Sequence, residues 1–284
     1  MAMRVGVSLP VREMAGDLVA IRDFAQAAEG MGLTHLRVPD QVMRPNSGHL
    51  HEPLSLLNYI AAITEKIELC PSVLVLPLRP AALVARQTAA LDVLSGGRLR
   101  LGIGVGASAP EFQALGVDFH QRGKICDEQL EVIHQLWQND SVSFAGRFHN
   151  FENNGIDPRP VQQPIPIWIG GRSIPSDAVV ERIGRWADGW FVLAGPEDYP
   201  AVRARVDAAA ERHGRAADAI GTEAGVAVVG PREAEWQARV QNWHDTGLTH
   251  LCLRTLGGGL EVGQHLPKLS EVVAELPVEN VRSE

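Results

Sequence analysis

Three short segments contain the residues best suited to chemistry, and each follows a short apolar run that is typical of a buried strand. They are Asp40 and Gln41; Gly104, Val105, Gly106 and Ala107; and Gly170, Gly171, Arg172 and Ser173. A carboxylate orients its neighbours by accepting hydrogen bonds, and glycine lets a ligand approach the backbone. Amides and a hydroxyl that precede a helix can hold a phosphate. Such a set favours a bound cofactor that supplies its own reactivity.

Other kinds of catalytic site find less support in the sequence. The candidate metal ligands His35, His49 and His51 come from one strand and one polar loop, so packed or solvated histidines are the simpler interpretation. No serine elbow or cysteine–histidine pairing is evident. The three cysteines, Cys70, Cys126 and Cys252, are widely spaced and indicate neither a zinc site nor a disulfide framework.

Two glycine patterns have alternative interpretations. Gly102, Gly104 and Ala107 match a dinucleotide-binding pattern, but Ala109 and Pro110 interrupt the helix that this pattern requires. The turn at residues 170–173 also fits an ordinary strand-to-helix connection. Residues 257–259, three glycines, offer a second phosphate-binding turn or a flexible loop.

The overall charge restricts the partners. A formal net charge of −8 argues against nucleic acid or an anionic membrane as a partner, because both favour a basic surface. No apolar run approaches the roughly 18 residues of a membrane span, and the first strand begins too early for a signal peptide. We therefore expect a cytoplasmic protein that acts on a small-molecule substrate. The oligomeric state stays open, with a homodimer as one option.

Apolar strands alternate with amphipathic helices along the whole sequence, which predicts an α/β fold with a parallel sheet. The helix before residue 95 is expected to bury Leu83, Gln87, Ala90, Leu91 and Leu94. Residues 107–164 break the alternation with a helix and a hairpin that turns at Gly146, and we expect this insertion to form a lid. The expected strands are 4–10, 34–38, 67–76, 99–103, 165–169, 187–192, 222–229 and 249–254. Eight such units predict a single (β/α)8 TIM-barrel domain over residues 1–284, with its site at the carboxyl ends of the strands.

Six sequence blocks stand out: GVSLP within 4–10, VPDQ at 38–41, LCPSVLVLPLRP at 69–80, LDVLSGGRLRLGIGVGASAPEF at 91–112, IWIGGRS at 167–173 and ADGWF at 187–191. Together they resemble the luciferase-like monooxygenase superfamily, and more narrowly its branch of oxidoreductases that depend on the deazaflavin coenzyme F420. They cover the chain to about residue 192, and beyond them only GLTHL at 247–251 adds to the resemblance.

The resemblance implies a role for each segment. Asp40 matches the acid after the second strand, and Ser72 and Val73 match a bulge on the third strand. Residues 104–107 match the loop that contacts the cofactor ring, and the turn at 170–173 is implied to meet the phosphate. The bond between Ser72 and Val73 is expected to be cis. Gln41 departs from the family, because members acting on sugars or alcohols usually have histidine there.

The expected function is hydride transfer between bound F420 and a small organic substrate. Glutamine cannot relay a proton near neutral pH, so Gln41 is expected to orient substrate, and reduction fits better than oxidation of an alcohol. Asp40 is expected to orient the cofactor or the lid loop. Arg79 and Arg172 are candidate cations for the acidic tail of the cofactor. One alternative is an FMN-dependent monooxygenase that uses oxygen, and another is a non-catalytic flavin-binding barrel.

Overall fold

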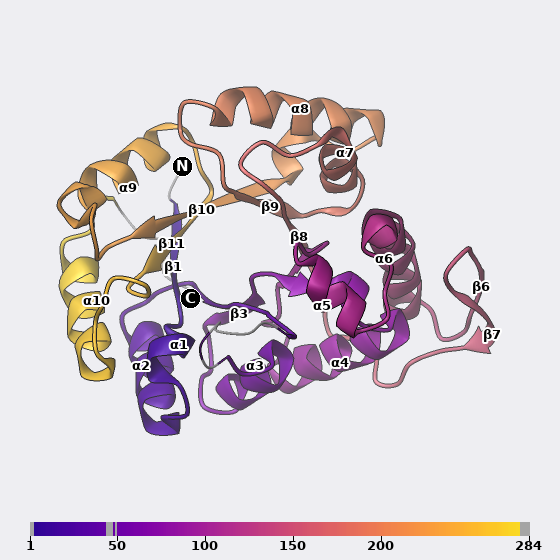
Figure 1. Cartoon of the computed structure of the whole chain (residues 1–284), viewed down its shortest axis with the longest axis horizontal. Coiled ribbons are helices and arrows are strands. Elements are labelled where there is room, and N and C mark those ends of the chain that lie inside the picture. The colour runs from indigo at the N-terminus through magenta and orange to yellow at the C-terminus, as the bar shows by residue number, and fades with distance from the viewer. Residues whose placement is uncertain (1–2, 44–47, 49, 279–284) are drawn as a thin grey trace.

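The computed structural model describes residues 3–43, 48 and 50–278. Parallel strands form a barrel, and helices surround it (Figure 1). The strands pair in the order β3-β2-β1-β11-β10-β9-β8-β5-β4. Their bounds are β1 Arg4–Ser8, β2 His35–Val38, β3 Glu68–Pro71, β4 Leu74–Val75, β5 Leu101–Gly104, β8 Ile167–Gly170, β9 Gly189–Val192, β10 Gly221–Ala227 and β11 His250–Arg254.

The third strand of the barrel is broken in two by Ser72 and Val73. Its first half, β3, pairs with β2, and its second half, β4, pairs with β5. A parallel bridge between Leu69 and Leu99 joins β3 to the segment before β5 and closes the ring. With β3 and β4 counted as one strand, the described residues form an eight-stranded barrel. The prediction of a TIM barrel is confirmed.

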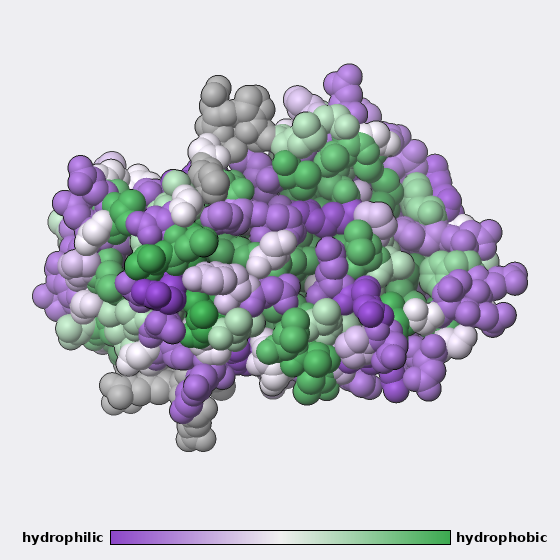
Figure 2. Space-filling model, turned by 90° about the horizontal axis from the view of Figure 1, so that it is seen from below, coloured by the Kyte–Doolittle hydropathy of each residue, from purple (hydrophilic) through white to green (hydrophobic). Residues whose placement is uncertain are grey.

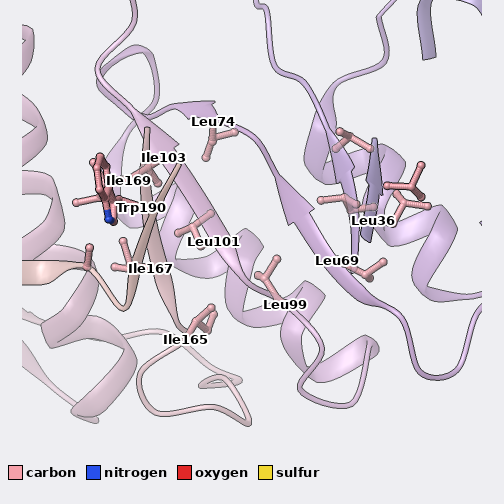
Figure 3. Close-up of a cluster of buried hydrophobic side chains, with 14 of the residues drawn as sticks. Leu36, Leu69, Leu74, Leu99, Leu101, Ile103, Ile165, Ile167, Ile169 and Trp190 are labelled. Atoms are coloured by element: carbon pink, nitrogen blue, oxygen red, sulfur yellow. The ribbon is translucent and has the colours of Figure 1, made fainter. Parts of the chain in front are cut away.

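The helices cover the outside of the barrel because the outward side chains of the strands are apolar. Figure 3 shows this layer, in which Leu101 and Ile103 of β5 lie beside Ile167 and Ile169 of β8. The helices are α1 Val11–Met14, α2 Leu18–Gly30, α3 Pro53–Ala61, α4 Ala81–Leu94, α5 Ala109–Ala114, α6 Arg122–Gln138, α7 Asp177–Trp186, α8 Tyr199–Arg212, α9 Trp236–Asp245 and α10 His265–Ala274. Among the described helices, none has the length and apolar character needed to cross a bilayer.

The predicted buried face of α4 is wrong at three of its five positions, because Gln87 is exposed as well as the two outer leucines. Leu83 and Leu94 are 51% and 70% exposed, whereas Val84, Ala85 and Leu91 are fully buried. The helix has apolar residues around most of its circumference, so spacing alone does not select the face. Packing between α3 and α6 decides it. Figure 2 shows exposed hydrophobic patches between hydrophilic residues on the side of the molecule that lies below α3 and α4 in Figure 1.

The segment expected to form a lid divides into two parts. The short helix α5 directly follows β5 and stays at the carboxyl end of the barrel. The longer helix α6 packs against α4 and α7, as an ordinary barrel helix does. The hairpin of β6 Val142–Ala145 and β7 Asn150–Asn154 lies beyond α6 at the edge of the molecule (Figure 1), where the Glu128 carboxylate of α6 accepts three backbone N–H groups of its turn. A lid role therefore stays a prediction for the part around α5.

Candidate functional site

The break in the third strand forms the floor of the barrel mouth. The Ser72–Val73 peptide bond is cis, so that prediction is confirmed. The Val73 side chain lies across β5 and β8, where a Cβ added to Gly104 or Gly170 would come within 2.6 and 2.8 Å of its methyl groups. The sequence indicated that something approaches these glycines closely. In the structure that group is the side chain of Val73.

Asp40 holds the strand just beyond this bulge. Its Oδ2 accepts hydrogen bonds from the backbone N–H of Val75, at 2.8 Å, and from the Arg79 guanidinium, at 2.7 Å, while Oδ1 accepts from Arg79 at 3.0 Å. The Asp40 side chain is 1% exposed. The carboxylate thus fixes the strand directly after the bulge, at the backbone of Val75. Arg79 also lies 3.5 Å from a Glu52 oxygen, so this candidate cation for the cofactor tail is already neutralised.

Arg37 of β2 connects the bulge to the interior of the barrel. Its guanidinium donates to the Oγ of Ser72 and, at 2.8 Å, to Oε1 of Glu223 in β10. It also stacks over the ring of Phe191 in β9, 4.7 Å from the ring centre. One side chain therefore contacts residues of three other barrel strands. Because Arg37 donates to the Oγ of Ser72, the single hydroxyl hydrogen of Ser72 remains available to a ligand.

Beneath Arg37, a buried network of charges fills the amino-terminal half of the barrel. Glu223 pairs with both Arg37 and Arg100, and Arg100 pairs with Glu68 at 2.6 Å. Burial alone would raise the pKa of Glu223, but Arg100, His35 and Arg37 outweigh it and hold that pKa well below its usual range. The two arginines and two glutamates balance in charge.

Two histidines complete this layer in their neutral form. Burial, and next the charge of Arg100, lower the pKa of His250 to about 2. Burial also lowers the pKa of His35, although Glu223 opposes this. His35, Glu223 and Cys252 bring possible ligand atoms within 4.8 Å of one another. Because arginines occupy both oxygens of Glu223, we interpret the cluster as an ion-pair network and not as a metal site. Of the other candidate ligands, His51 contacts the Ala15 carbonyl at 3.1 Å, and His49 lies outside the described residues.

Gln41 lies at the mouth beside a tethered loop. Its Oε1 is buried and has no hydrogen-bond partner in the described part of the chain. The next two residues, Val42 and Met43, donate their backbone N–H groups to Oε1 of Glu111 in α5, at 2.7 and 2.9 Å. The buried Glu111 carboxylate was missed by sequence reasoning. It fixes the start of the loop and so the position of Gln41.

The ring-contact loop predicted at residues 104–107 lies between the bulge and α5. Gly106 has φ +73°, and an added Cβ would lie 2.7 Å from Val75 and 2.8 Å from Phe112. This requires glycine on both conformational and steric grounds. Val105 is half-buried, and Ala107 is exposed at the surface of the mouth.

The predicted phosphate turn lies at the carboxyl end of β8. Arg172 and Ser173 are exposed, and Gly171 is half-buried. The following helix α7 begins only at Asp177, so Ser173 does not cap it. No hydrogen bond or ion pair engages the Arg172 guanidinium within the described residues. Unlike Arg79, this arginine is free to meet an anion.

A cavity of about 200 Å³ opens next to the bulge, at the ends of β1, β2, β3 and β11. Sequence reasoning missed most of its polar wall, in which Ser8 and Arg254 end strands and Arg12 and Glu13 belong to α1. The residues that line it are Ser8, Leu9, Val11, Arg12, Glu13, Arg37, Val38, Pro39, Ser72, Arg254 and Leu256.

A parallel eight-stranded barrel with a bulge, unpaired polar atoms and a cavity at the carboxyl ends of its strands has the architecture of a TIM-barrel enzyme. The family model described as luciferase-like monooxygenase matches residues 3–259. The chain belongs to that family, and the resemblance seen in the sequence is confirmed.

Its relatives differ in cofactor. An uncharacterized protein of Mycobacterium tuberculosis is 32% identical over 211 residues, which are 68% of this chain and 72% of that protein. An F420-dependent glucose-6-phosphate dehydrogenase of Kineococcus radiotolerans is 33% identical over 68% of this chain and 57% of its own length. An FMNH2-dependent dimethylsulfone monooxygenase of Pseudomonas putida is 30% identical over 58% and 47%.

A solved structure gives the same fold. An F420-dependent secondary alcohol dehydrogenase in complex with an F420–acetone adduct superimposes with a TM-score of 0.82, over 96% of this chain and 98% of that one. The sequence identity is 15%, so this likeness shows the fold alone.

Proposed function

We propose that this protein is an oxidoreductase that transfers hydride between coenzyme F420 and a small organic substrate, in the direction of substrate reduction. The observation that carries the proposal is the bulge at Ser72 and Val73, which Asp40 and Arg37 hold from opposite sides at the mouth of the barrel. The F420-dependent relative matches a larger share of this chain than the FMNH2-dependent one does, which supports the choice of cofactor.

The residues present fit a deazaflavin. Val73 and the loop at residues 104–107 offer an apolar surface for a planar ring. Within the described residues, the buried Oε1 of Gln41 lacks a donor, and a bound ring or substrate can supply one. The unpaired Arg172, beside Gly170 and Gly171, suits the phosphate and the acidic tail.

When bound, the deazaflavin supplies the hydride chemistry, and the chain supplies position. Asp40 keeps β4 and Arg79 in place, so the bulge cannot shift under the ring. Glu111 fixes the loop that carries Gln41. Holding two reactants in a fixed orientation can lower a barrier by roughly 7–11 kcal/mol without a protein acid. Gln41 orients the substrate with its amide and transfers no proton.

Fluorescence titration of the purified protein with F420 and with FMN tests the proposal. We expect tighter binding of F420, followed by F420-dependent turnover of a reducible substrate without oxygen. Equal or tighter binding of FMN would overturn the choice of cofactor. Tight F420 binding with no turnover of any reducible substrate would instead favour a non-catalytic carrier.

A second candidate, a reduced-flavin monooxygenase, rests on the FMNH2-dependent relative. The two candidates differ in their need for oxygen. Consumption of oxygen that depends on both reduced FMN and substrate would favour this candidate.

A further inference from the structure

The cavity beside the bulge is lined by three arginines, two of which have no partner among the described residues, and by one carboxylate, that of Glu13. Among the described residues, no hydrogen bond or ion pair engages the side chains of Arg12 or Arg254. Arg37 is paired with Glu223 and Ser72, but its Nε is buried without a partner. A concentration of arginines in one small cavity contrasts with the net charge of −8 on the whole chain. An oxyanion is the ligand that such guanidinium groups favour.

Two other groups define what accompanies that oxyanion. The Oγ of Ser72 accepts a hydrogen bond from Arg37, so its own hydrogen is available to a ligand. Oε1 of Glu13 accepts the backbone N–H of Gly257 at 2.7 Å, but Oε2 is buried and has no partner among the residues that the structure describes. A buried carboxylate oxygen beside a ligand needs a donor. The wall therefore offers a cation and the Ser72 hydroxyl for an anion, and one acceptor for a hydroxyl or amino hydrogen.

We infer that this cavity binds the acid end of the substrate, and that the substrate is a small organic acid with a hydroxyl or amino group beside its carboxylate or phosphate. Arg254, with Ser72, holds the anion, and Glu13 accepts the hydrogen of the neighbouring group. The volume of about 200 Å³ is below that of a pocket for a drug-sized ligand, so only a small molecule fits. The inference rests on the proposed function, because Ser72 places the acid next to the expected cofactor ring.

The same oxyanion chemistry could come from the cofactor, whose phosphate and acidic tail are also anions. The position of the cavity argues for the substrate. It lies at the ends of β1, β2 and β11, whereas the unpaired Arg172 lies at the end of β8, and in the barrel β11, β10 and β9 separate β1 from β8. An experiment can separate the two sources, since a substrate site stays open when the cofactor is bound.

Calorimetric titration of the protein with lactate, malate and inorganic phosphate, first without and then with saturating F420, tests the inference. We expect an anion to bind in both states and the neutral analogue lactamide to bind about tenfold or more weakly. Arg254→Gln should weaken anion binding about tenfold, and Arg254→Lys should weaken it less. Arg86→Gln, on the exposed outer side of α4, is the control and should bind as the wild type does.

Glu13 gives an independent arm of the test. In the wild type, lactate should bind more tightly than propionate, which lacks the hydroxyl. In Glu13→Ala that preference should disappear. Circular dichroism of each variant verifies that it is folded.

Three results would overturn the inference: no anion binds, Arg254→Gln binds as tightly as the wild type, or F420 displaces the anion and so identifies the cavity as part of the cofactor site. Failure of the proposed function looks different. If the protein binds the anion but does not bind F420, the anion site stands and the proposed use of F420 is wrong.

Discussion

The two ends of the barrel interior contain similar charged and polar residues, but these residues are paired with one another at one end and not at the other. At the amino ends of the strands, Glu223 and Glu68 neutralise Arg100 and Arg37 at distances of 2.6 to 2.8 Å. At the mouth, Oε2 of Glu13 and Oε1 of Gln41 have no hydrogen-bond partner among the described residues. An unpaired buried polar atom costs about 1–3 kcal/mol. Such atoms occur in the amino-terminal layer as well, at Nη2 of Arg100, but there each charged group has a partner of opposite sign. The contrast therefore lies in the charges, because within the described residues no ion pair engages Glu13 or Arg254 at the mouth.

Arg37 belongs to both ends. It pairs with Glu223 below and donates to Ser72 above, so the structural network determines the position of the binding floor. The four predictions that follow perturb one end at a time and ask whether the other end responds.

The largest effect is expected at the amino-terminal end, from Glu223→Gln. The substitution removes the charge that pairs with Arg37 and Arg100. It leaves Arg100 with Glu68 and leaves Arg37 without a carboxylate partner among the described residues. We expect the free energy of unfolding to fall by about 3–5 kcal/mol, measured by urea denaturation. The control, Glu181→Gln, breaks an exposed pair with Arg212 and should change the free energy of unfolding far less. Equal effects of the two variants would show that the buried network is not structural.

At the mouth, Asp40→Asn should act on function more than on stability. An amide has one acceptor oxygen and no charge, so the hydrogen bond from Arg79 to Oδ1 and the ion pair with Arg79 are lost, and Arg79 and β4 loosen behind the bulge. We expect F420 affinity or turnover to fall about tenfold or more, equivalent to about 1.4 kcal/mol. Asp188→Asn is matched to it, because Asp188 also accepts a backbone N–H, that of Ile167, at the opposite end of the barrel. If Asp40→Asn binds F420 and turns over substrate as the wild type does, Asp40 only stabilises the local loop.

Acid should act through the histidines of the interior. His250 has its pKa lowered from 6.5 to about 2 in the folded protein, so below pH 6.5 the unfolded chain binds a proton that the folded chain does not. The contribution of neutral His250 to the free energy of unfolding is therefore fully present above pH 6.5. It declines as pH falls, by up to about 1.4 kcal/mol per pH unit. His250→Gln should flatten the decline between pH 6.5 and about 4, as measured by thermal unfolding. His244→Gln, on the exposed end of α9, is the control, and an unchanged slope in His250→Gln would contradict the assignment.

The alternation of the fold could be predicted from the sequence because strands such as residues 165–169 are apolar on both faces and separated by helical spacing. The face of α4 could not, since Leu83 and Leu94 are as apolar as the buried Leu91. For the site, the bulge at Ser72 and Val73 was found through a resemblance and not through periodicity. A short strand gives no local signal for a break that only β2, β5 and Asp40 stabilise.

The interior charges were missed although a signal exists. A parallel barrel strand is covered by helices outside and by other strands inside, so a charged residue within it has no solvent face. His35 is in register with Glu68, and Glu223 with His250, which places all four in one layer. The cavity residues Glu13 and Arg254 give no such signal, because they come from opposite ends of the sequence and meet only when the barrel closes.

The smallest effect is expected at the far side of the mouth, from Arg172→Glu. This exposed guanidinium has no partner in the part of the chain that the structure describes, so its reversal should leave the fold intact and act on a bound anion alone. We expect F420 to bind a few-fold more weakly at low salt and almost normally at high salt, since exposed charges are screened over about 10 Å at 0.1 M salt. Arg185→Glu, on the outer side of α7 and 3.8 Å from Glu131, is the control for a change in net charge. If both variants weaken binding equally, the effect belongs to the overall field of the protein and the turn at residues 170–173 does not hold the tail. If only Arg172→Glu weakens it while lactate binding is unchanged, the cofactor tail and the substrate acid occupy opposite sides of the same mouth.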